Sequence, residues 1–369
     1  MRLLSTSSPT LDLTSKDLTG KGLAVNDLAA NDLTVNDLAA NSFDLKIGSI
    51  KLDNPFIVAP MAGLTDWPYR RLCLEEGASL AVTEMASAVS LAHQGRKTLA
   101  LLASDRAIEK HLCVQLFGKD PATMAEAAKV AVFQAGASMI DLNFGCPARK
   151  VVRSGHGGAL LRDPDLCLRI VEAVASCVSV PVTVKTRPGF APEDGPIILS
   201  LAKKYQQAGA AAITLHPRYV TCAFTGQADW SLIDSLADAV TIPVIGSGDI
   251  KTPEAAVSAL KSSGASGVMI GRASRGCPWF FRQCLEILSQ GIAREITPME
   301  RLNTALLHAR LLRDLIGPKA AFRLRTVLTW YTRELPGAAA LRSAICREDN
   351  VDKQMDLLTQ AFLGFEAKL

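Results

Sequence analysis

The sequence of 369 residues lacks several features that mark specialised classes of protein. It has no uninterrupted run of about 18 apolar residues, because even the apolar segment 168–184 contains Arg169, Glu172 and Pro181, and this excludes a membrane-spanning helix. The first residues lack the apolar core of a secretory signal, and their aspartates argue against a transit peptide. We therefore predict a soluble, cytoplasmic globular protein, whose 49% hydrophobic residues suffice for a large core.

The sequence also lacks a metal-ligand pattern and a strong excess of one charge. The nine cysteines include no CxxC pair and no Cys/His cluster at zinc spacing, so we expect no structural metal and a reducing compartment. The net charge of +4 is too small to indicate an anionic partner by itself. The charge is unevenly distributed, however, since the segment 301–347 carries eight arginines and one lysine against two acidic residues.

The first 42 residues differ in composition from the rest of the chain. Five-residue units such as NDLAA and NDLTV recur there, each with a central leucine. A solenoid needs more stacked turns than this tract could supply. We therefore predict a low-complexity, disordered leader over residues 1–42, with no catalytic role.

Eight short apolar runs alternate with helical stretches in the next 250 residues. Strand alternating with helix indicates a parallel sheet, and eight such units predict an α/β fold of the (β/α)8 TIM-barrel type over residues 43–293, with a doubly wound sheet as the alternative. From residue 297 to 369 apolar residues recur at helical spacing, which predicts a smaller all-helical domain. The eight runs are 56–61, 80–85, 111–117, 138–145, 182–187, 212–217, 243–248 and 267–272.

Nearly every predicted strand ends in a residue suited to a ligand site. In a TIM barrel these ends surround the active site. The glycine-rich turns after the seventh and eighth runs, with Arg272 beside them, are typical of a phosphate site. The strand-end residues are Met61 with Ala62, Glu84, Gln115, Asn143 with Cys146, Lys185 with Arg187, His216 with Arg218, Gly248 with Asp249, and Gly271 with Arg272.

Four side chains at this barrel mouth indicate the chemistry. A barrel-lining ammonium on Lys185 needs an anionic or electron-rich partner, and it could serve as a Schiff-base nucleophile or as a cation against a cofactor that gains negative charge. The amide of Gln115 suits the edge of a planar heterocycle. Together with a phosphate site, these groups indicate a flavin mononucleotide (FMN) pocket. Cys146, in a polar loop bounded by Gly and Pro, is the cysteine we expect to act as nucleophile or proton donor, with Asn143 nearby to bind an amide-like edge.

Several segments in order carry a family resemblance. APMAGLTDWPYR, VQLFG, DLNFGCPARKVVRSGHGGALLRDP, VKTR, TLHPR, FTGQADW, IGSGDI and IGRAS resemble the tRNA-dihydrouridine synthases, most closely their bacterial B-type branch, from about residue 43 to the end of the chain. The resemblance implies an FMN-dependent oxidoreductase that uses NADPH to reduce the 5,6 double bond of selected uridines in tRNA.

The resemblance also implies a role for individual residues. Cys146 would be the catalytic proton donor, and Asn143, Arg187 and Arg218 would contact the substrate. The helical domain would bind tRNA phosphates through Arg310, Arg313, Lys319, Arg323, Arg325 and Arg333. The cofactor would be bound by Pro60, Met61, Ala62, Gln115, Lys185, His216, Ser247, Gly248, Asp249, Gly271 and Arg272.

Three other functions stay open at the level of sequence. The nearest is an FMN oxidoreductase acting on a free pyrimidine or another small molecule, against which the basic helical domain argues. The second is a phosphosugar aldolase or lyase with Lys185 as Schiff base, and the third a non-catalytic RNA-binding module. No membrane, metal or protein partner is implied.

Overall fold

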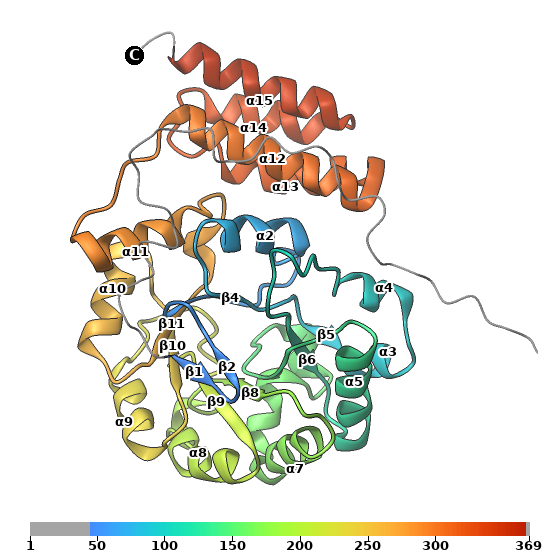
Figure 1. Cartoon of the computed structure of the whole chain (residues 1–369), viewed down its shortest axis with the longest axis vertical. Helices are drawn as coiled ribbons and strands as arrows, with labels where there is room; N and C mark the ends of the chain where they lie inside the picture. Colours follow the sequence, from blue (N-terminus) through green and yellow to red (C-terminus); the bar gives the residue numbers. More distant parts are fainter. Residues whose placement is uncertain (1–44, 367–369) are drawn as a thin grey trace, which may run out of the picture. The chain divides into compact units, whose positions relative to one another are not determined.

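The computed structural model describes residues 45–366, so the predicted leader at 1–42 lies outside the described residues. Parallel strands form a barrel with helices around it (Figure 1). In sheet order the strands run β4-β3-β11-β10-β9-β8-β7-β6-β5. Their bounds are β3 (Phe56–Val58), β4 (Leu80–Ala81), β5 (Ala86–Ser87), β6 (Cys113–Phe117), β7 (Met139–Phe144), β8 (Val182–Thr186), β9 (Ala210–Leu215), β10 (Val244–Ser247) and β11 (Gly267–Ile270).

The prediction of a TIM barrel is confirmed, and each of the eight predicted runs overlaps a strand, although β9 begins two residues before its run. The second run contains β4 alone, and β5 follows directly after it; these two strands lie at opposite ends of the sheet order. Val82, directly after β4, forms a parallel bridge with Cys113 of β6, so the two pieces act as one strand that closes the ring. Within residues 45–366 this closure leaves the barrel sheet without an open edge. Consecutive strands pair because each helical crossover returns the chain to the same end of the barrel.

The helices of the barrel begin where the sequence places caps. Asp120 accepts a hydrogen bond from the N–H of Thr123, and Pro121 occupies the first turn of its helix, where a missing N–H costs nothing. Thr252 caps the helix that begins at Pro253 in the same way. The barrel helices are α2 (Trp67–Glu75), α3 (Ala88–Ala92), α4 (Arg96–Ala100), α5 (Pro121–Phe133), α6 (Arg149–Arg153), α7 (Pro164–Ala175), α8 (Ile198–Gln207), α9 (Ser231–Ala239), α10 (Pro253–Ser262) and α11 (Phe280–Gln290), with short 3-10 turns η2 (Gly157–Arg162), η3 (Pro192–Asp194) and η4 (Arg272–Ser274).

A hairpin that we did not predict closes the amino-terminal end of the barrel. Strands β1 (Lys46–Ile47) and β2 (Ile50–Lys51) pair antiparallel around a two-residue turn, and Gly48 adopts a φ of 56° there, as such tight turns require. The buried side chains of the hairpin pack on residues from the barrel strands, among them Ile57 and Met269. The hairpin therefore seals the end opposite the carboxyl ends of the strands.

The carboxyl-terminal residues form only helices within the described range. These are α12 (Pro298–Ile316), η5 (Gly317–Lys319), α13 (Ala320–Trp330), α14 (Ala338–Arg347) and α15 (Val351–Glu366). Thr297 begins α12 with a capping box, since it bonds the N–H of Glu300 while the carboxylate of Glu300 accepts from the N–H of Thr297. The apolar faces of these helices pack together in a separate hydrophobic core. The buried Trp279, which precedes α11, also belongs to this core.

Specific contacts attach these helices to the barrel. Arg323 of α13 forms an ion pair of 2.8 Å with Asp66, the residue that also caps α2. Gly276 has a φ of 66° and lies so close to Trp330 that a Cβ atom would come within 2.7 Å of its backbone. Only glycine combines that conformation with that approach.

No described helix is both long and apolar enough to cross a membrane.

Candidate active site

A cavity of about 850 Å³ lies at the carboxyl ends of the barrel strands. Of the residues that we predicted to bind cofactor or substrate or to act in catalysis, all but Arg218 line it. The structure thus brings together side chains separated by more than 200 positions in the sequence. The predicted residues in the lining are Pro60, Met61, Ala62, Gln115, Asn143, Cys146, Lys185, Arg187, His216, Ser247, Gly248, Asp249, Gly271 and Arg272.

The lining is strongly cationic. Its one carboxylate belongs to Asp249, and both oxygens of that carboxylate lie 2.6 Å from the guanidinium of Arg218, which lowers the pKa of Asp249 despite burial. A cavity with this charge favours an anionic ligand. The cationic lining residues are Arg149, Lys185, Arg187, Lys251, Arg272 and Arg275.

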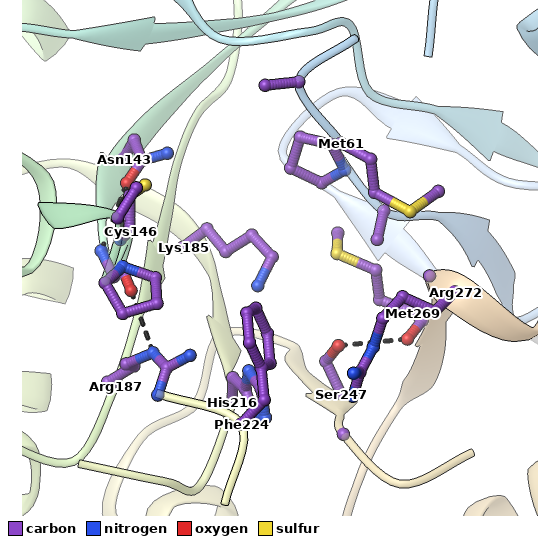
Figure 2. A pocket seen from close by; sticks show the side chains of 18 of the residues that line it. Met61, Asn143, Cys146, Lys185, Arg187, His216, Phe224, Ser247, Met269 and Arg272 are labelled. Atoms are coloured by element: carbon purple, nitrogen blue, oxygen red, sulfur yellow. Dashed lines mark hydrogen bonds between the residues drawn. The ribbon is translucent and has the colours of Figure 1, made fainter. Parts of the chain in front are cut away.

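Lys185 extends from the end of β8 into the middle of the cavity (Figure 2). Burial lowers the pKa of its ammonium to about 8, an effect that the nearby carboxylate of Asp141 opposes. Within residues 45–366 its Nζ makes no hydrogen bond or ion pair with a side chain or carbonyl. The ammonium is therefore placed to bind a ligand in the cavity.

Cys146 lies in the loop after β7, and Asn143 orients that loop. The Oδ1 atom of Asn143 accepts hydrogen bonds from the N–H groups of Gly145 (3.2 Å) and Cys146 (3.0 Å). Gly157, with a φ of 59°, packs so closely behind the cysteine that a Cβ atom there would come within 2.9 Å of the Cβ of Cys146. These contacts hold the thiol on the opposite side of the cavity from Met61, Met269 and Arg272 (Figure 2).

The two arginines assigned to substrate also hold the loop between β9 and α9. Arg187 donates to the carbonyls of Gly145, Arg218, Tyr219 and Ala223, at 2.8–3.2 Å. Burial and the charge of Arg218 lower the pKa of Arg187 to about 10, which leaves it a cation at neutral pH.

Arg218 binds the same loop but does not line the cavity. Its guanidinium donates to the carbonyls of Thr225 and Gly226 and pairs with Asp249, so its donors are used within the protein. The geometry places Arg218 behind the lining rather than against a ligand.

Replacing Arg218 with leucine should therefore destabilise the fold more than it changes ligand contacts. The change leaves the Asp249 carboxylate with the N–H of Ala228 but without its ion pair, and it removes the donor to the carbonyls of Thr225 and Gly226. Loss of one member of a buried pair typically costs about 3 kcal/mol. Urea denaturation should show this loss. The double variant Arg218→Leu, Asp249→Leu should lose less than the sum of the single variants, and strict additivity would contradict the pairing.

His216 is neutral in this setting. Burial, aided by four surrounding cations that include Lys185, lowers the pKa of the imidazole to about 2. Its Nε2 lies 3.1 Å from the guanidinium of Arg218, which can only donate, so Nε2 accepts and Nδ1 carries the proton.

The predicted phosphate end lies between β10 and β11. The seventh turn leads into α10, while the eighth leads directly into the short helix η4, the arrangement in which barrels commonly hold a phosphate. The hydroxyl of Ser247 donates a hydrogen bond to the carbonyl of Met269 at 3.1 Å. The guanidinium of Arg272 lies 4.6 Å from the ring centre of Phe224, a half-exposed aromatic residue that also lines the cavity.

The sequence analysis did not identify several residues of the site. Asp141 is buried directly beneath the cavity, and the signal for it was an acidic residue in the middle of an apolar strand. Phe224, Met85 and Arg275 had no such signal, because only the fold brings their loops to the cavity. Glu84, which we expected at the mouth, instead accepts a hydrogen bond from the N–H of Gly63 and is absent from the lining.

The six predicted tRNA contacts divide into two groups. Arg313 and Arg323 form ion pairs of 2.8 Å with Asp352 and Asp66, and Arg325 pairs with Asp349. Arg310, Lys319 and Arg333 are exposed and have no ion pair with any described residue.

One of these exposed arginines lies close to the cavity. Burial lowers the pKa of Arg275, and the positive charges of Arg333 and Arg272 lower it further, so the three guanidinium groups are neighbours. Arg272 and Arg275 line the cavity and Arg333 follows α13, and we call these three residues the arginine row.

No group of three or more His, Cys, Asp or Glu side chains in residues 45–366 is arranged to hold a metal ion.

Fold and site together define a TIM-barrel enzyme with a thiol in a cationic cavity whose charge favours an anionic ligand. The family described as dihydrouridine synthase (Dus) matches this chain over residues 57–365. The chain belongs to the dihydrouridine synthase family, a family of oxidoreductases.

Individual relatives agree with this assignment and lie in the B-type branch. The tRNA-dihydrouridine synthase B of Vibrio cholerae serotype O1 is 39% identical, over 86% of this chain and 98% of that protein. The enzyme of the same name from Escherichia coli strain K12 is 38% identical, over 87% of this chain and 100% of that protein.

Solved structures with similar folds have little sequence in common with the chain. A 2-naphthoyl-CoA reductase in complex with 2-naphthoyl-CoA aligns with a TM-score of 0.53 at 12% identity, over 68% of this chain and 52% of that one. TcOYE with pHBA aligns with a TM-score of 0.51 at 14% identity, over 70% of this chain and 94% of that one. These likenesses concern the barrel fold alone.

Proposed function

We propose that this chain is an FMN-dependent tRNA-dihydrouridine synthase, which reduces the 5,6 double bond of specific uridines in tRNA with NADPH as the electron donor. The observation that carries the proposal is that a thiol, on Cys146, and an unpartnered ammonium, on Lys185, line one cavity (Figure 2). The relatives, which are named tRNA-dihydrouridine synthases, support tRNA as the substrate. Such a substrate is consistent with work in the cytoplasm.

The lining fits FMN in its charge and in its donor groups. The turns at Ser247–Asp249 and Gly271–Arg272, next to α10 and η4, suit the phosphate. The lining has six cations and one carboxylate, and that carboxylate already pairs with Arg218. The resulting positive charge suits both the phosphate and a ring that gains negative charge. When bound, FMN supplies a hydride. In the proposed division of the chain, FMN would bind to the barrel over residues 43–293, and the residues that would hold its ring are Pro60, Met61, Ala62, Gln115, Lys185 and His216.

In the proposed reaction the protein itself donates a proton and orients the uracil that receives it. The hydride goes to one carbon of the uracil 5,6 double bond, and the Sγ of Cys146 gives its proton to the other, which saturates that bond. The thiolate that remains is stabilised by the positive charges of Lys185 and Arg187. The Nδ2 of Asn143 donates to the Oε1 of Gln115 at 2.9 Å and to the thioether of Met85 at 3.7 Å. A thioether is a weak acceptor, so this second hydrogen can turn to orient the uracil.

The direct test is a visible absorption spectrum of the purified protein, followed by NADPH under anaerobic conditions. We expect the two flavin maxima and their bleaching on reduction, and the reduced protein should form dihydrouridine in unmodified tRNA, as measured by nucleoside mass spectrometry. A colourless protein that FMN cannot reconstitute would refute the proposal. Reduction of free uridine at the same rate as tRNA would favour the alternative, an FMN oxidoreductase acting on a free pyrimidine.

We propose that the helices over residues 297–369 bind tRNA and that Arg310, Lys319 and Arg333 make most of the phosphate contacts. These three cations are available because no carboxylate of residues 45–366 pairs with them, unlike Arg313, Arg323 and Arg325. The arginine row would continue the contact toward the cavity.

Replacing Arg333 with alanine should weaken tRNA binding and reduce its salt dependence. Each phosphate contact that is lost should lower the slope of log affinity against log salt by about 1. Fluorescence anisotropy over a series of salt concentrations measures both quantities. Lys203→Ala removes one positive charge from α8 on the barrel and should leave the slope unchanged; an equal effect of the two variants would show that only net charge matters.

A further inference from the structure

A continuous chain of hydrogen bonds runs from the interior of the barrel to the cysteine loop. Thr183 donates to the Oδ1 of Asp141 at 2.6 Å, and the Nε2 of Gln115 donates to its Oδ2 at 2.7 Å. The Nδ2 of Asn143 then donates to the Oε1 of Gln115 at 2.9 Å. Because the Oδ1 of Asn143 accepts from the N–H of Cys146, the chain ends at the cysteine. We call this chain of side chains the relay.

The strand register produces the relay. Gln115 lies directly opposite Asp141 on the neighbouring strand, and Asp141 lies directly opposite Thr183 on the next one. Two residues further along, Asn143 lies opposite Lys185. Residues two apart in a strand point to the same face, so a polar layer inside the barrel lies beneath the layer that carries the cavity groups.

The chemistry of Asp141 sets the direction of every bond in the relay. An ionised carboxylate can only accept hydrogen bonds, so it turns the amide nitrogen of Gln115 toward itself and the amide oxygen toward Asn143. That oxygen needs a donor, so the nitrogen of Asn143 turns toward it, and its oxygen is left to accept from the loop. Asp141 is only 2% exposed, so solvent does not supply alternative partners.

We propose that Asp141 is a positioning residue that fixes the amide orientations of Gln115 and Asn143 and thereby holds Cys146 in place. A second consequence concerns the ligand. With their oxygens used inside the protein, Gln115 and Asn143 present only N–H groups to the cavity, next to the ammonium of Lys185. This side of the cavity therefore recognises hydrogen-bond acceptors, such as the carbonyl oxygens of a planar ring. This reading of the ligand rests on the proposed function, whereas the positioning of Cys146 does not.

Site-resolved alkylation of Cys146 tests the proposal on the protein without cofactor or tRNA. The full chain is treated with iodoacetamide, and peptide mass spectrometry compares the rate at Cys146 with that at Cys346, an exposed cysteine that serves as internal reference. Asp141→Leu removes the acceptor that orders the relay, and we expect Cys146 to react about fivefold faster, the factor that corresponds to the net free energy of one hydrogen bond. Asp141→Asn should keep the wild-type rate, because its oxygen can accept from Gln115 while its nitrogen donates to Thr183.

Two further variants separate positioning from loss of stability. Glu109→Gln neutralises an equally buried carboxylate, which pairs with Arg70 away from the cavity, and should leave the rate at Cys146 unchanged. Gln115→Leu cuts the relay one bond further along, should accelerate labelling as Asp141→Leu does, and covers the case in which Asp141→Leu fails to fold.

A double-variant cycle then tests whether the two residues act in series. The double variant of Asp141 and Gln115 should react no faster than either single variant, because one relay can be broken only once. Additive effects, or a folded Asp141→Leu protein that labels at the wild-type rate, would overturn the proposal.

The affinity for FMN gives a second readout. In a fluorescence titration Asp141→Leu should bind FMN about 25-fold more weakly, since two oriented donors are lost and each corresponds to a factor of about five. If the wild-type protein binds no FMN, the proposed function fails, but the labelling experiment still decides whether Asp141 positions the cysteine.

Discussion

Replacing Cys146 with alanine should reduce the formation of dihydrouridine about 1000-fold while the protein still binds FMN and accepts electrons from NADPH. A positioned general acid typically contributes between about 100- and 10,000-fold, and alanine cannot supply the proton. The change should leave the flavin contacts intact, because the cysteine lies across the cavity from the predicted phosphate end (Figure 2). Single-turnover reduction of tRNA by the pre-reduced protein measures the step in isolation.

Two controls accompany this experiment. Cys146→Ser keeps a proton donor of similar size but much weaker acidity, so its rate should lie between those of the wild type and the alanine variant. Cys346→Ala removes an exposed cysteine outside the cavity and should have no effect. Unchanged tRNA reduction by Cys146→Ala would eliminate the acid role of this thiol.

Replacing Lys185 with methionine should slow the reduction of tRNA about 100-fold or more and should change its pH dependence. The ammonium is placed to stabilise negative charge in a cavity that excludes much of the solvent, and the loss of one such group typically costs that much. Burial lowers the pKa of Lys185 to about 8, so the wild-type cation is lost as the pH rises through about 8. We therefore expect the wild-type rate to fall over that range, whereas the methionine variant should show no such fall.

The matched variant is Lys185→Arg, which keeps the positive charge at every accessible pH. Its rate should be lower than that of the wild type, because a planar guanidinium does not replace a compact ammonium, but the fall above pH 8 should disappear. Stopped-flow measurements of the single-turnover rate across the pH range distinguish the three proteins. An alkaline fall that persists in Lys185→Met would assign it to another group.

The arginines Arg187 and Arg218 show how loop stability and ligand binding overlap at this site. Their guanidinium groups bind five carbonyl groups of the segment 218–226, which carries Phe224 into the lining. Ala223, next to that ring, has a φ of 48°, a conformation that non-glycine residues seldom adopt. The loop is therefore held in a strained shape by charged groups, and substitutions of either arginine should affect folding as well as the reaction.

Much of the fold follows from local patterns in the chain. Apolar runs of six to eight residues predicted the strands, because such a signal depends only on neighbouring residues. The start of α5 is equally local, since Asp120 caps this helix and Pro121 occupies its first turn. The hairpin β1–β2 was missed, since strands of two residues are too short for a periodic signal. The division of the second strand into β4 and β5 was missed for the same reason.

The site shows the same division between local and non-local information. Lys185, Cys146 and Gln115 were identifiable as polar groups at the ends of apolar runs, and the structure places all three in one cavity. Arg218 satisfies the same pattern and yet lies behind the lining, because its partner Asp249 comes from the next strand of the barrel. The residues near Arg218 in the sequence therefore could not predict its pairing with Asp249.

The sequence by itself thus determined the order of strands and helices, the barrel class, and which residue types stand at the strand ends. Only the tertiary structure decided which of these groups pair with each other and which remain for a ligand. The register of β6, β7 and β8 sets Asp141 between Gln115 and Thr183, and ring closure through Val82 brings the first and second strands to the third. Such pairings arise between residues far apart in the chain, and the strand register that creates them is set by the packing of the whole barrel.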